Sequence, residues 1–463
     1  MHSSNSQMKS FDLSVQPAQA WIAILGFVLF STLCIVLHAS NILRLLFPTS
    51  SFAVGLFLYL RHPGIYIGFT FWIWFVTPWV RRLVDYQNGW QDPSTVLLAP
   101  YLVTFITVIT FLRYFPLYRQ AGLPFVLAVM GILYGFLVGL INLPIATVII
   151  SLLNWLTPVL FGFHLFVNWQ DYPGYRQIIE RTFLWGALVI GAYGVWQYLV
   201  APDWDRFWLI NMANQGLITF GQPEPLAIRV FSTMNANGPF AIVMMAALLL
   251  LFNTPGILRF PASAVGYLSF LLSLTRAAWL GWFAGVLIFV TSVKPRIQIR
   301  LIMTILIMVL CVLPLTTMEP FHQAINSRFQ TFSNTSNDIS YNERSERYEQ
   351  SMNIALSEVV GKGLGGAGNH LDSAILDTLF SLGWIGTSLY WGGLLLLMLG
   401  TLHAVSFDPF VSAARAISIG VFIQLVFGSV MLEVSGVILW GFLGIAMAAR
   451  QYYQHRAKSY FSK

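Results

Sequence analysis

The chain has 463 residues, of which 57% are hydrophobic and 9% are charged, and its mean hydropathy is +0.70. Soluble globular proteins carry about 45–50% apolar and about 25% charged residues, so this composition excludes an ordinary soluble protein and predicts a polytopic membrane protein. The net charge of +7 comes from basic residues scattered between apolar segments, which argues against a nucleic-acid partner.

Two cysteines, Cys34 and Cys311, both fall within apolar segments, so the sequence predicts neither a disulfide framework nor a metal site. The N-terminus lacks a charged region leading into a short apolar core and a small-residue cleavage site. We therefore expect the first apolar segment to be retained.

Apolar segments of helical length recur along the whole chain and predict one all-α membrane domain over residues 1–463, a bundle of about 12–14 spans. Segments 44–60 and 261–275 are short and interrupted, so each is either a span or a re-entrant or broken helix. The fourteen candidate segments are 20–39, 44–60, 64–80, 95–112, 122–140, 144–166, 182–200, 237–252, 261–275, 277–292, 299–315, 376–400, 412–430 and 434–449.

Two long polar segments separate these spans, residues 201–236 and 316–377. If the basic C-terminal tail is cytoplasmic, fourteen spans place the N-terminus on the same side and both polar segments on the outer face. Basic residues of short loops then lie mostly inside, as expected for membrane proteins. Arg81 and Arg82 are the exception, and they either supplement an outer anion site or reflect a miscounted span.

The second polar segment contains a charged stretch that predicts a helix. Asn342 can cap a helix that runs to about Val360. An apolar stripe formed by Met352, Leu356, Val359 and Val360 predicts that this helix is amphipathic and lies at the membrane surface or against the bundle.

Three glycines after this helix, Gly363, Gly365 and Gly368, have the spacing of a dinucleotide-binding loop. No strand precedes them, so we do not expect a dinucleotide site. They either end the helix and form the turn into the next span, or form a nest of backbone N–H groups that binds phosphate.

Arginines beside the outer ends of spans are candidate anion ligands. Arg276 interrupts an apolar stretch at a cost of at least about 2.5–3.5 kcal/mol, so it either caps a helical hairpin or binds a phosphate in an outer cavity. Arg229 is either an interfacial anchor or a second ligand. Arg344 and Arg347 are helix ion-pair partners or supporting ligands.

His370 and Asp372 follow the glycines, with Asp377 and Glu358 nearby. Such residues are either solvated loop residues or a general base toward a sugar hydroxyl at the mouth of an outer cavity. No arrangement of a serine triad, zinc ligands or a phosphate-binding Walker loop is evident.

Four stretches in the C-terminal half resemble the O-antigen ligase and polymerase superfamily of bacterial envelope proteins, over about residues 225 to 400. Their order and spacing, with a large loop between the later spans, carry the resemblance. The stretches are RVFSTMNANGPFA (229–241), SLTRAAWLGW (273–282), RYEQSMNIALSEVVGKGLGGAG (347–368) and LDSAILDTLFSLGWIG (371–386).

The resemblance implies a glycosyltransferase of the bacterial inner membrane, with both termini cytoplasmic and with residues 201–236 and 316–377 as periplasmic loops. It implies transfer of a glycan from an undecaprenyl-diphosphate carrier without a metal or other cofactor. The acceptor is another lipid-linked repeat unit in a polymerase and lipid A core in a ligase. The expected partners are membrane lipid, this lipid-linked glycan, a chain-length regulator and a flippase.

Carried over by position, Arg229 and Arg276 match arginines expected to hold the donor diphosphate. Ligases typically have a His-Asn pair eleven residues before the glycine that matches Gly383, and here Asp372 occupies the histidine position. Either Asp372 is the base, or His370 reaches the site, or the protein is not a ligase. This departure favours a polymerase of O-antigen or exopolysaccharide type, with a ligase and a transporter of bicarbonate-like anions or solutes as alternatives.

Overall fold

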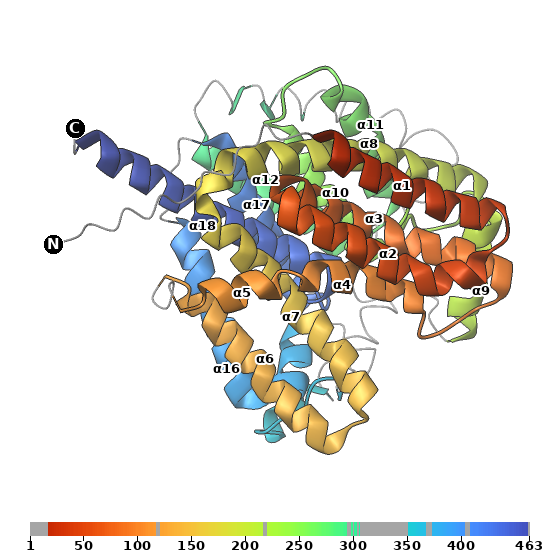
Figure 1. Ribbon diagram of the computed structural model, residues 1–463, viewed down its shortest axis with the longest axis horizontal. Coiled ribbons are helices and arrows are strands. Elements are labelled where there is room, and N and C mark those ends of the chain that lie inside the picture. Colours follow the sequence, from red (N-terminus) through yellow and green to blue (C-terminus); the bar gives the residue numbers. More distant parts are fainter. Residues whose placement is uncertain are drawn as a thin grey trace, which may run out of the picture.

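The computed structural model describes residues 17–116, 121–215, 220–293, 298–299, 301–302, 305, 351–366, 373–402 and 408–461. In these ranges the chain forms helices and turns, with one isolated bridge between Gly221 and Ile228, so the predicted all-α fold is confirmed (Figure 1). The first helices are α1 (Pro17–Val36), α2 (Ser40–Arg61), α3 (Pro63–Asn88), η1 (Thr95–Leu97), α4 (Leu98–Phe105), α5 (Val108–Tyr114), α6 (Leu123–Asn142), α7 (Ile145–Val167), η2 (Trp169–Asp171), α8 (Tyr172–Val200) and α9 (Asp203–Asn214). The later ones are α10 (Asn237–Leu251), α11 (Arg259–Leu272), α12 (Arg276–Ser292), α16 (Ala374–Leu402), α17 (Pro409–Ile423), η4 (Gln424–Val426) and α18 (Glu433–Phe461).

Nine helical stretches of the described chain are long and apolar enough to cross a membrane, which makes the protein a polytopic helical bundle. Thirteen of the fourteen predicted segments coincide with helices, and the remaining one, 299–315, lies largely outside the described residues. The helix α2 continues through Pro48, so the alternative of a broken helix at 44–60 is wrong. The helix α11 has 14 residues. At 1.5 Å per residue it spans about 21 Å, less than the roughly 30 Å of a hydrocarbon core.

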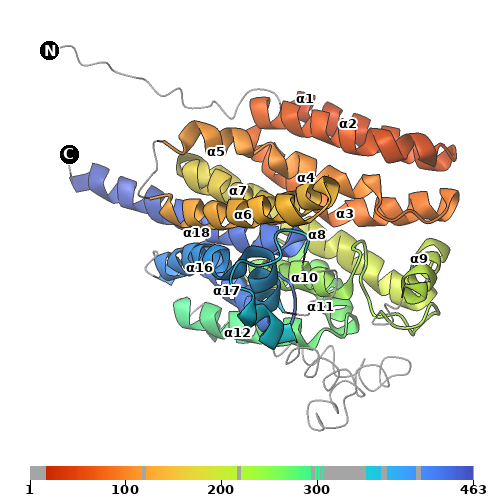
Figure 2. The ribbon, with the colours of Figure 1, turned by 90° about the horizontal axis from the view of Figure 1, so that it is seen from below.

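The long helices of the described chain run between two ends of the bundle (Figure 2), and the two ends differ in their polar contacts. At one end, here called the Asp408 end, the Asp408 carboxylate accepts hydrogen bonds from Tyr172 (2.6 Å), Tyr453 (2.8 Å) and Arg176 (2.9 Å). Figure 2 shows α1 beginning and α18 ending toward this end. At the other end, here called the α9 end, α8, α11 and α17 end and α10, α12, α16 and α18 begin.

The core is formed by helices that other helices surround. Every residue of α10 from Phe240 to Leu251 is buried, and α10 contacts α8, α11, α12, α17 and α18. Many of the helices pack in pairs, with α16 along α6, α18 along α7, α12 along α17 and α11 along α8. This arrangement leaves α1 and α2 at the edge, where many of their apolar side chains are exposed.

Glycines allow the paired helices to approach at backbone distance. A Cβ added at Gly162 of α7 would lie 2.5 Å from the Trp440 carbonyl oxygen of α18, and one added at Gly281 of α12 would lie 2.4 Å from the Gly420 carbonyl oxygen of α17. Small residues at such crossings are typical of helices that associate within a membrane, because lipid provides no hydrophobic drive between them.

Replacing Gly162 by alanine should lower the stability of the bundle by about 1–3 kcal/mol, because the added methyl group overlaps the α18 backbone. Thermal unfolding of the purified protein in detergent would measure the change. The control is Gly392→Ala in α16, where the added Cβ meets no atom within 4 Å and stability should stay the same or rise slightly. Equal unfolding temperatures for the two variants would contradict the close packing of α7 and α18.

Candidate functional site

The segment that contains Arg229 lies against the turn between α11 and α12. The backbone N–H of Arg229 donates to the Phe220 carbonyl oxygen (2.9 Å), which closes a short bridged turn. One residue later, Val230 donates to the Leu272 carbonyl oxygen at the end of α11 (3.0 Å). The Asn237 side-chain amide donates to the Ser273 carbonyl oxygen (3.2 Å). Residues 229–237 are therefore fixed to the turn that leads into Arg276.

Arg276 is the first residue of α12 and is half-buried at the α9 end. The turn before it contains Leu274 in the left-handed region, with φ +52°, and Thr275 with an extended backbone. The N-terminus of a helix carries a partial positive charge and free N–H groups, which favour a bound anion. The structure thus brings the two arginine-bearing segments together, at an end of the bundle where a helix begins.

A buried ion pair fixes the residues that follow Arg229. Arg82 of α3 and Asp205 of α9 are both fully buried, and the Arg82 Nε atom lies 3.1 Å from Asp205 Oδ1. The Arg82 guanidinium also donates to the carbonyl oxygens of Met234 (2.8 Å) and Ser232. It lies over the Phe231 ring, 4.7 Å from the centroid. Arg82 therefore neutralises Asp205 and holds the 231–234 backbone at the same time.

Gln197 of α8 completes this cluster. Its side-chain carbonyl oxygen accepts from the N–H groups of Phe231 (3.1 Å) and Ser232 (2.8 Å), and its amide nitrogen donates to Asp205 Oδ2 (2.7 Å). Tyr193 donates to the same oxygen (2.9 Å). Burial raises the pKa of the Asp205 carboxyl, against the lowering effects of Arg82, Gln197 and Tyr193. We call Arg82, Gln197, Asp205 and Ser232 the Arg82 cluster.

Arg81 and Arg82, which did not fit the expected distribution of basic residues between the two faces, thus have structural roles. Arg81 pairs with Asp85 (3.2 Å) and donates to the Gln91 carbonyl oxygen (3.0 Å), while Arg82 has no exposed surface. The suggestion that they supplement an anion site is wrong for Arg82, because a fully buried guanidinium that binds Asp205 and two carbonyl groups cannot meet a ligand. The segment 201–236 also contains the helix α9, which carries Asp205 and which the sequence analysis did not predict.

Residues 359–364 pass between α6 and α16. The backbone N–H of Lys362 donates to the Phe380 carbonyl oxygen of α16 (2.7 Å), and that of Leu364 donates to the Gly135 carbonyl oxygen of α6 (2.9 Å). Gly363 has φ +88°, and a Cβ there would lie 2.2 Å from the Gly139 nitrogen. Only glycine fits this position, since it needs both the left-handed backbone and the close approach. Gly363 therefore packs this segment against α6, where the sequence suggested either a turn or a phosphate nest.

The helix that the sequence predicts in this region ends earlier than expected. The sequence predicts a helix that reaches about Val360. In the described chain residues 351–357 are helical, and Val359 and Val360 lie beyond the end of this helix. Its buried face is formed by Ala355, which packs in a cluster with Leu376, Leu379 and Phe380, while Leu356 is 45% exposed. Gly365 has φ +93° and lies near Thr147 and Ser151 of α7, and its supporting role stays a prediction.

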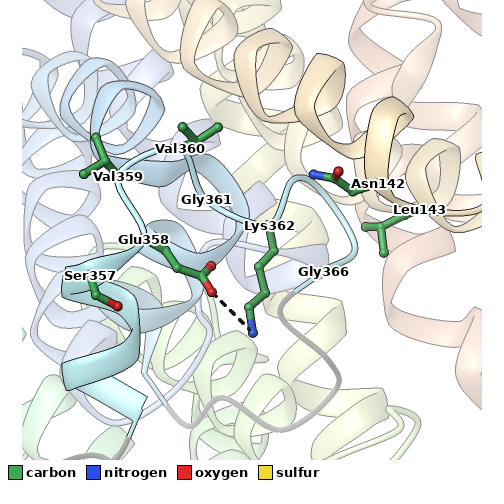
Figure 3. Close-up of a pocket in the computed structure, with 9 residues that line it drawn as sticks. All are labelled: Asn142, Leu143, Ser357, Glu358, Val359, Val360, Gly361, Lys362 and Gly366. Carbon is green, nitrogen blue, oxygen red and sulfur yellow. Dashed lines mark ion pairs between the residues drawn. The ribbon is translucent and has the colours of Figure 1, made fainter.

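A groove lies where this segment meets the turn between α6 and α7 (Figure 3). Its volume is about 570 Å³, and its lining includes Asn142, Leu143, Ser357, Glu358 and Lys362. The Lys362 ammonium lies 4.0 Å from the Glu358 carboxylate and 4.8 Å from the Phe380 ring centroid. We call this space the Lys362 groove.

The first turn of α16 adds a buried carboxylate at the α9 end. Asp377 accepts hydrogen bonds from Ser381 of the same helix (3.2 Å) and from Ser429, which lies before α18. The sequence analysis placed Asp377 at the end of a loop, whereas the structure places it within the helix. The predicted bases Asp372 and His370 lie outside the described residues, as do Arg344, Arg347 and Gly368.

The sequence analysis did not predict the Arg82 cluster, because no local sequence pattern indicates it. Its arginine and its aspartate are far apart in the chain and belong to a span and to a polar segment. The available signal was the unusual pair Arg81 and Arg82 at the end of a predicted span. In the described ranges, His, Cys, Asp and Glu side chains nowhere gather in threes at metal-binding distance.

Replacing Asp205 by asparagine should lower the free energy of unfolding by about 3–5 kcal/mol, because Arg82 loses the buried carboxylate that neutralises it. Asp203→Asn is the matched control. Asp203 lies on the same helix, is 70% exposed and pairs with Arg206 at 3.9 Å, so its replacement should change stability little. Denaturant unfolding monitored by tryptophan fluorescence compares the two. Similar losses from both variants would show that the buried pair has no special role.

The family model described as O-antigen ligase matches residues 261–391. The matched segment begins in α11, includes Arg276 and the residues of the Lys362 groove from Ser357 to Gly366, and ends in α16. No curated protein matches the chain. Residues 261–391 are therefore similar to the O-antigen ligase family, which supports the O-antigen ligase and polymerase superfamily, and the membrane-crossing helices of the described chain make it a polytopic membrane protein.

Proposed function

We propose that the protein is an inner-membrane glycosyltransferase that polymerises undecaprenyl-diphosphate-linked oligosaccharide repeats into O-antigen or exopolysaccharide. The observation that carries this proposal is the contact between the two arginine-bearing segments. Val230 and Leu272 are joined by a 3.0 Å backbone hydrogen bond, one residue after Arg229 and four residues before Arg276. Two arginines anchored to one turn at the membrane edge suit a diphosphate that is attached to a lipid.

The chemistry needs a cationic site for the leaving group. When the bond between the anomeric carbon and the phosphate oxygen breaks, the diphosphate keeps the electron pair and gains negative charge. Guanidinium groups that already face this position stabilise the charge as it develops. In this proposal Arg229 and Arg276 bind the donor diphosphate, and the positive end of α12 adds to their field.

The acceptor hydroxyl needs a base, because its oxygen attacks the anomeric carbon as it loses its proton. Asp372 and His370 are the two candidates, and either can take this proton. The described residues nearest to them in the chain are Gly366 and the buried Ser373, which precedes α16 at the α9 end. This position supports a reaction at the same end of the bundle as the arginines.

The proposed orientation places the α9 end at the periplasmic face and the Asp408 end at the cytoplasmic face. The basic residues Arg450, Arg456 and Lys458 of α18 support it, because short cytoplasmic segments of membrane proteins are enriched in lysine and arginine. In this orientation the enzyme receives lipid-linked repeats that a flippase delivers, and we expect a chain-length regulator of the same pathway as a partner.

A ligase is the alternative, because the matching family model is described as O-antigen ligase. A ligase shares the donor site and transfers the glycan to lipid A core or another acceptor. The residues Asp372 and Ser373, which stand where ligases typically have His-Asn, favour the polymerase.

Replacing Arg276 by alanine should reduce polymer formation by about 10²–10³-fold, because the leaving diphosphate loses a positively charged donor. A gel of the glycans from a deletion strain complemented with each variant measures the effect. The control is Arg259→Ala, since Arg259 is also the first residue of a helix and half-buried, but belongs to the other end of α11. Normal polymer from Arg276→Ala, with the protein inserted at wild-type level, would contradict the proposal.

The same gel separates the alternatives. Loss of the protein should leave single repeat units if it is a polymerase, and full-length polymer held on its carrier if it is a ligase. Asp372→Asn and His370→Gln then test the base, and the variant that loses activity identifies it. An unchanged glycan profile after deletion would mean that the protein does not act on this polymer.

A further inference from the structure

The Lys362 groove lies at the boundary between apolar and polar surface. Val359 and Val360 of its lining are 58% and 57% exposed. Beside Asn142 and Leu143, the neighbouring residues Ile141 and Ile145 are 83% and 66% exposed. So much apolar surface around one turn would be unusual in water, but it is ordinary for a membrane protein whose surface meets lipid chains. The groove therefore opens where lipid is the neighbouring medium.

Polar and apolar side chains leave the segment on different sides. Figure 3 shows Glu358 and Lys362 extending toward one another on one side of the segment, with Val359 and Val360 on the other. This arrangement resembles that of interfacial segments, in which apolar residues enter the acyl region and charged residues reach the head groups.

The charged pair in the groove is open to a ligand. The Lys362 ammonium and the Glu358 carboxylate are 4.0 Å apart, which is longer than a hydrogen bond, and the two side chains are 44% and 34% exposed. An ammonium has three donors and a carboxylate has two acceptor oxygens, so this contact leaves capacity on both groups. A ligand with one negative and one positive group can satisfy both.

We propose that the Lys362 groove binds the head group of a zwitterionic phospholipid that carries a phosphate and a primary amine. The lipid phosphate contacts the Lys362 ammonium, and the lipid amine contacts the Glu358 carboxylate. The acyl chains continue along the exposed side chains of Ile141, Ile145 and Val360. A volume of about 570 Å³ is sufficient for such a head group. Neither Arg229 nor Arg276 is among the residues that line the groove, and the proposal does not depend on the proposed function.

Charge complementarity selects this class of lipid. A phospholipid with a phosphate and an uncharged head group would satisfy Lys362 but leave the nearby Glu358 carboxylate facing the phosphate. A lipid diphosphate would increase that repulsion. The amine removes it, because it places a positive charge beside Glu358.

Lipid retention by the purified protein tests the proposal. The probes are phosphatidylethanolamine and phosphatidylglycerol, which differ in the presence of the amine, mixed equally in the detergent micelles and counted on the protein by native mass spectrometry. Wild type should retain phosphatidylethanolamine in preference. Glu358→Gln should lower the ratio of ethanolamine to glycerol lipid by roughly tenfold, because one charged contact is lost. Lys362→Gln should lower retention of both lipids.

Matched controls come from α9, where Asp203 and Arg206 form an exposed pair with nearly the same separation, 3.9 Å. Asp203→Asn and Arg206→Gln should leave the lipid ratio unchanged. Equal retention of both lipids by wild type would overturn the proposal, and this comparison needs no variant. A ratio that Glu358→Gln leaves unchanged, or a site that prefers an added polyprenyl diphosphate over phosphatidylethanolamine, would overturn it as well.

Discussion

The fold depends on the close approach of helix backbones. Within a membrane there is no hydrophobic driving force for this approach, because lipid chains are as apolar as the side chains. Association then relies on packing, and packing improves when two backbones touch. In this bundle the contacts occur at glycines on both partners, as with Gly162 and Gly444 between α7 and α18, and Gly281 and Gly420 between α12 and α17. The same kind of contact fixes Gly363 against Gly139, so packing against a span also holds residues 359–364, which precede α16 in the chain.

Polar contacts act at the two ends of this apolar frame. At the Asp408 end, one carboxylate joins the starts of α8 and α17 to the last turns of α18. At the α9 end, the Arg82 cluster joins α3, α8 and α9 to the backbone after Arg229. Buried ion pairs contribute little net stability, because desolvation offsets their attraction, but a missing partner is costly. The buried ion pair of Arg82 and Asp205 instead favours a single arrangement of the chain, and this arrangement fixes the position of the segment that contains Arg229.

The sequence was sufficient to predict the spans and the similarity to the O-antigen ligase family, because both depend on features that are local. Apolar length predicts a span, and the matched segment at 261–391 contains the stretches around Arg276 and Gly365 on which the resemblance rests. The end of the helix before Val360 and the course of Gly363 between α6 and α16 could not be predicted. They depend on contacts with Gly139 and Phe380, which the chain brings near only when it folds. The pairing of Arg82 with Asp205 could not be predicted either, because these residues also approach one another only when the chain folds.

The burial of α10 has a consequence for the order of assembly. Helices α11, α12, α17 and α18 cover α10, and all of them are synthesised after it. When α10 enters the membrane it therefore contacts lipid on faces that later contact protein. From Phe240 to Leu251 every side chain is apolar, so both environments suit it equally. A helix with a polar stripe is unfavourable in lipid until its partner helices cover the polar side chains. The apolar helix α10 has no such groups, so it can remain in the bilayer until the last span has been inserted.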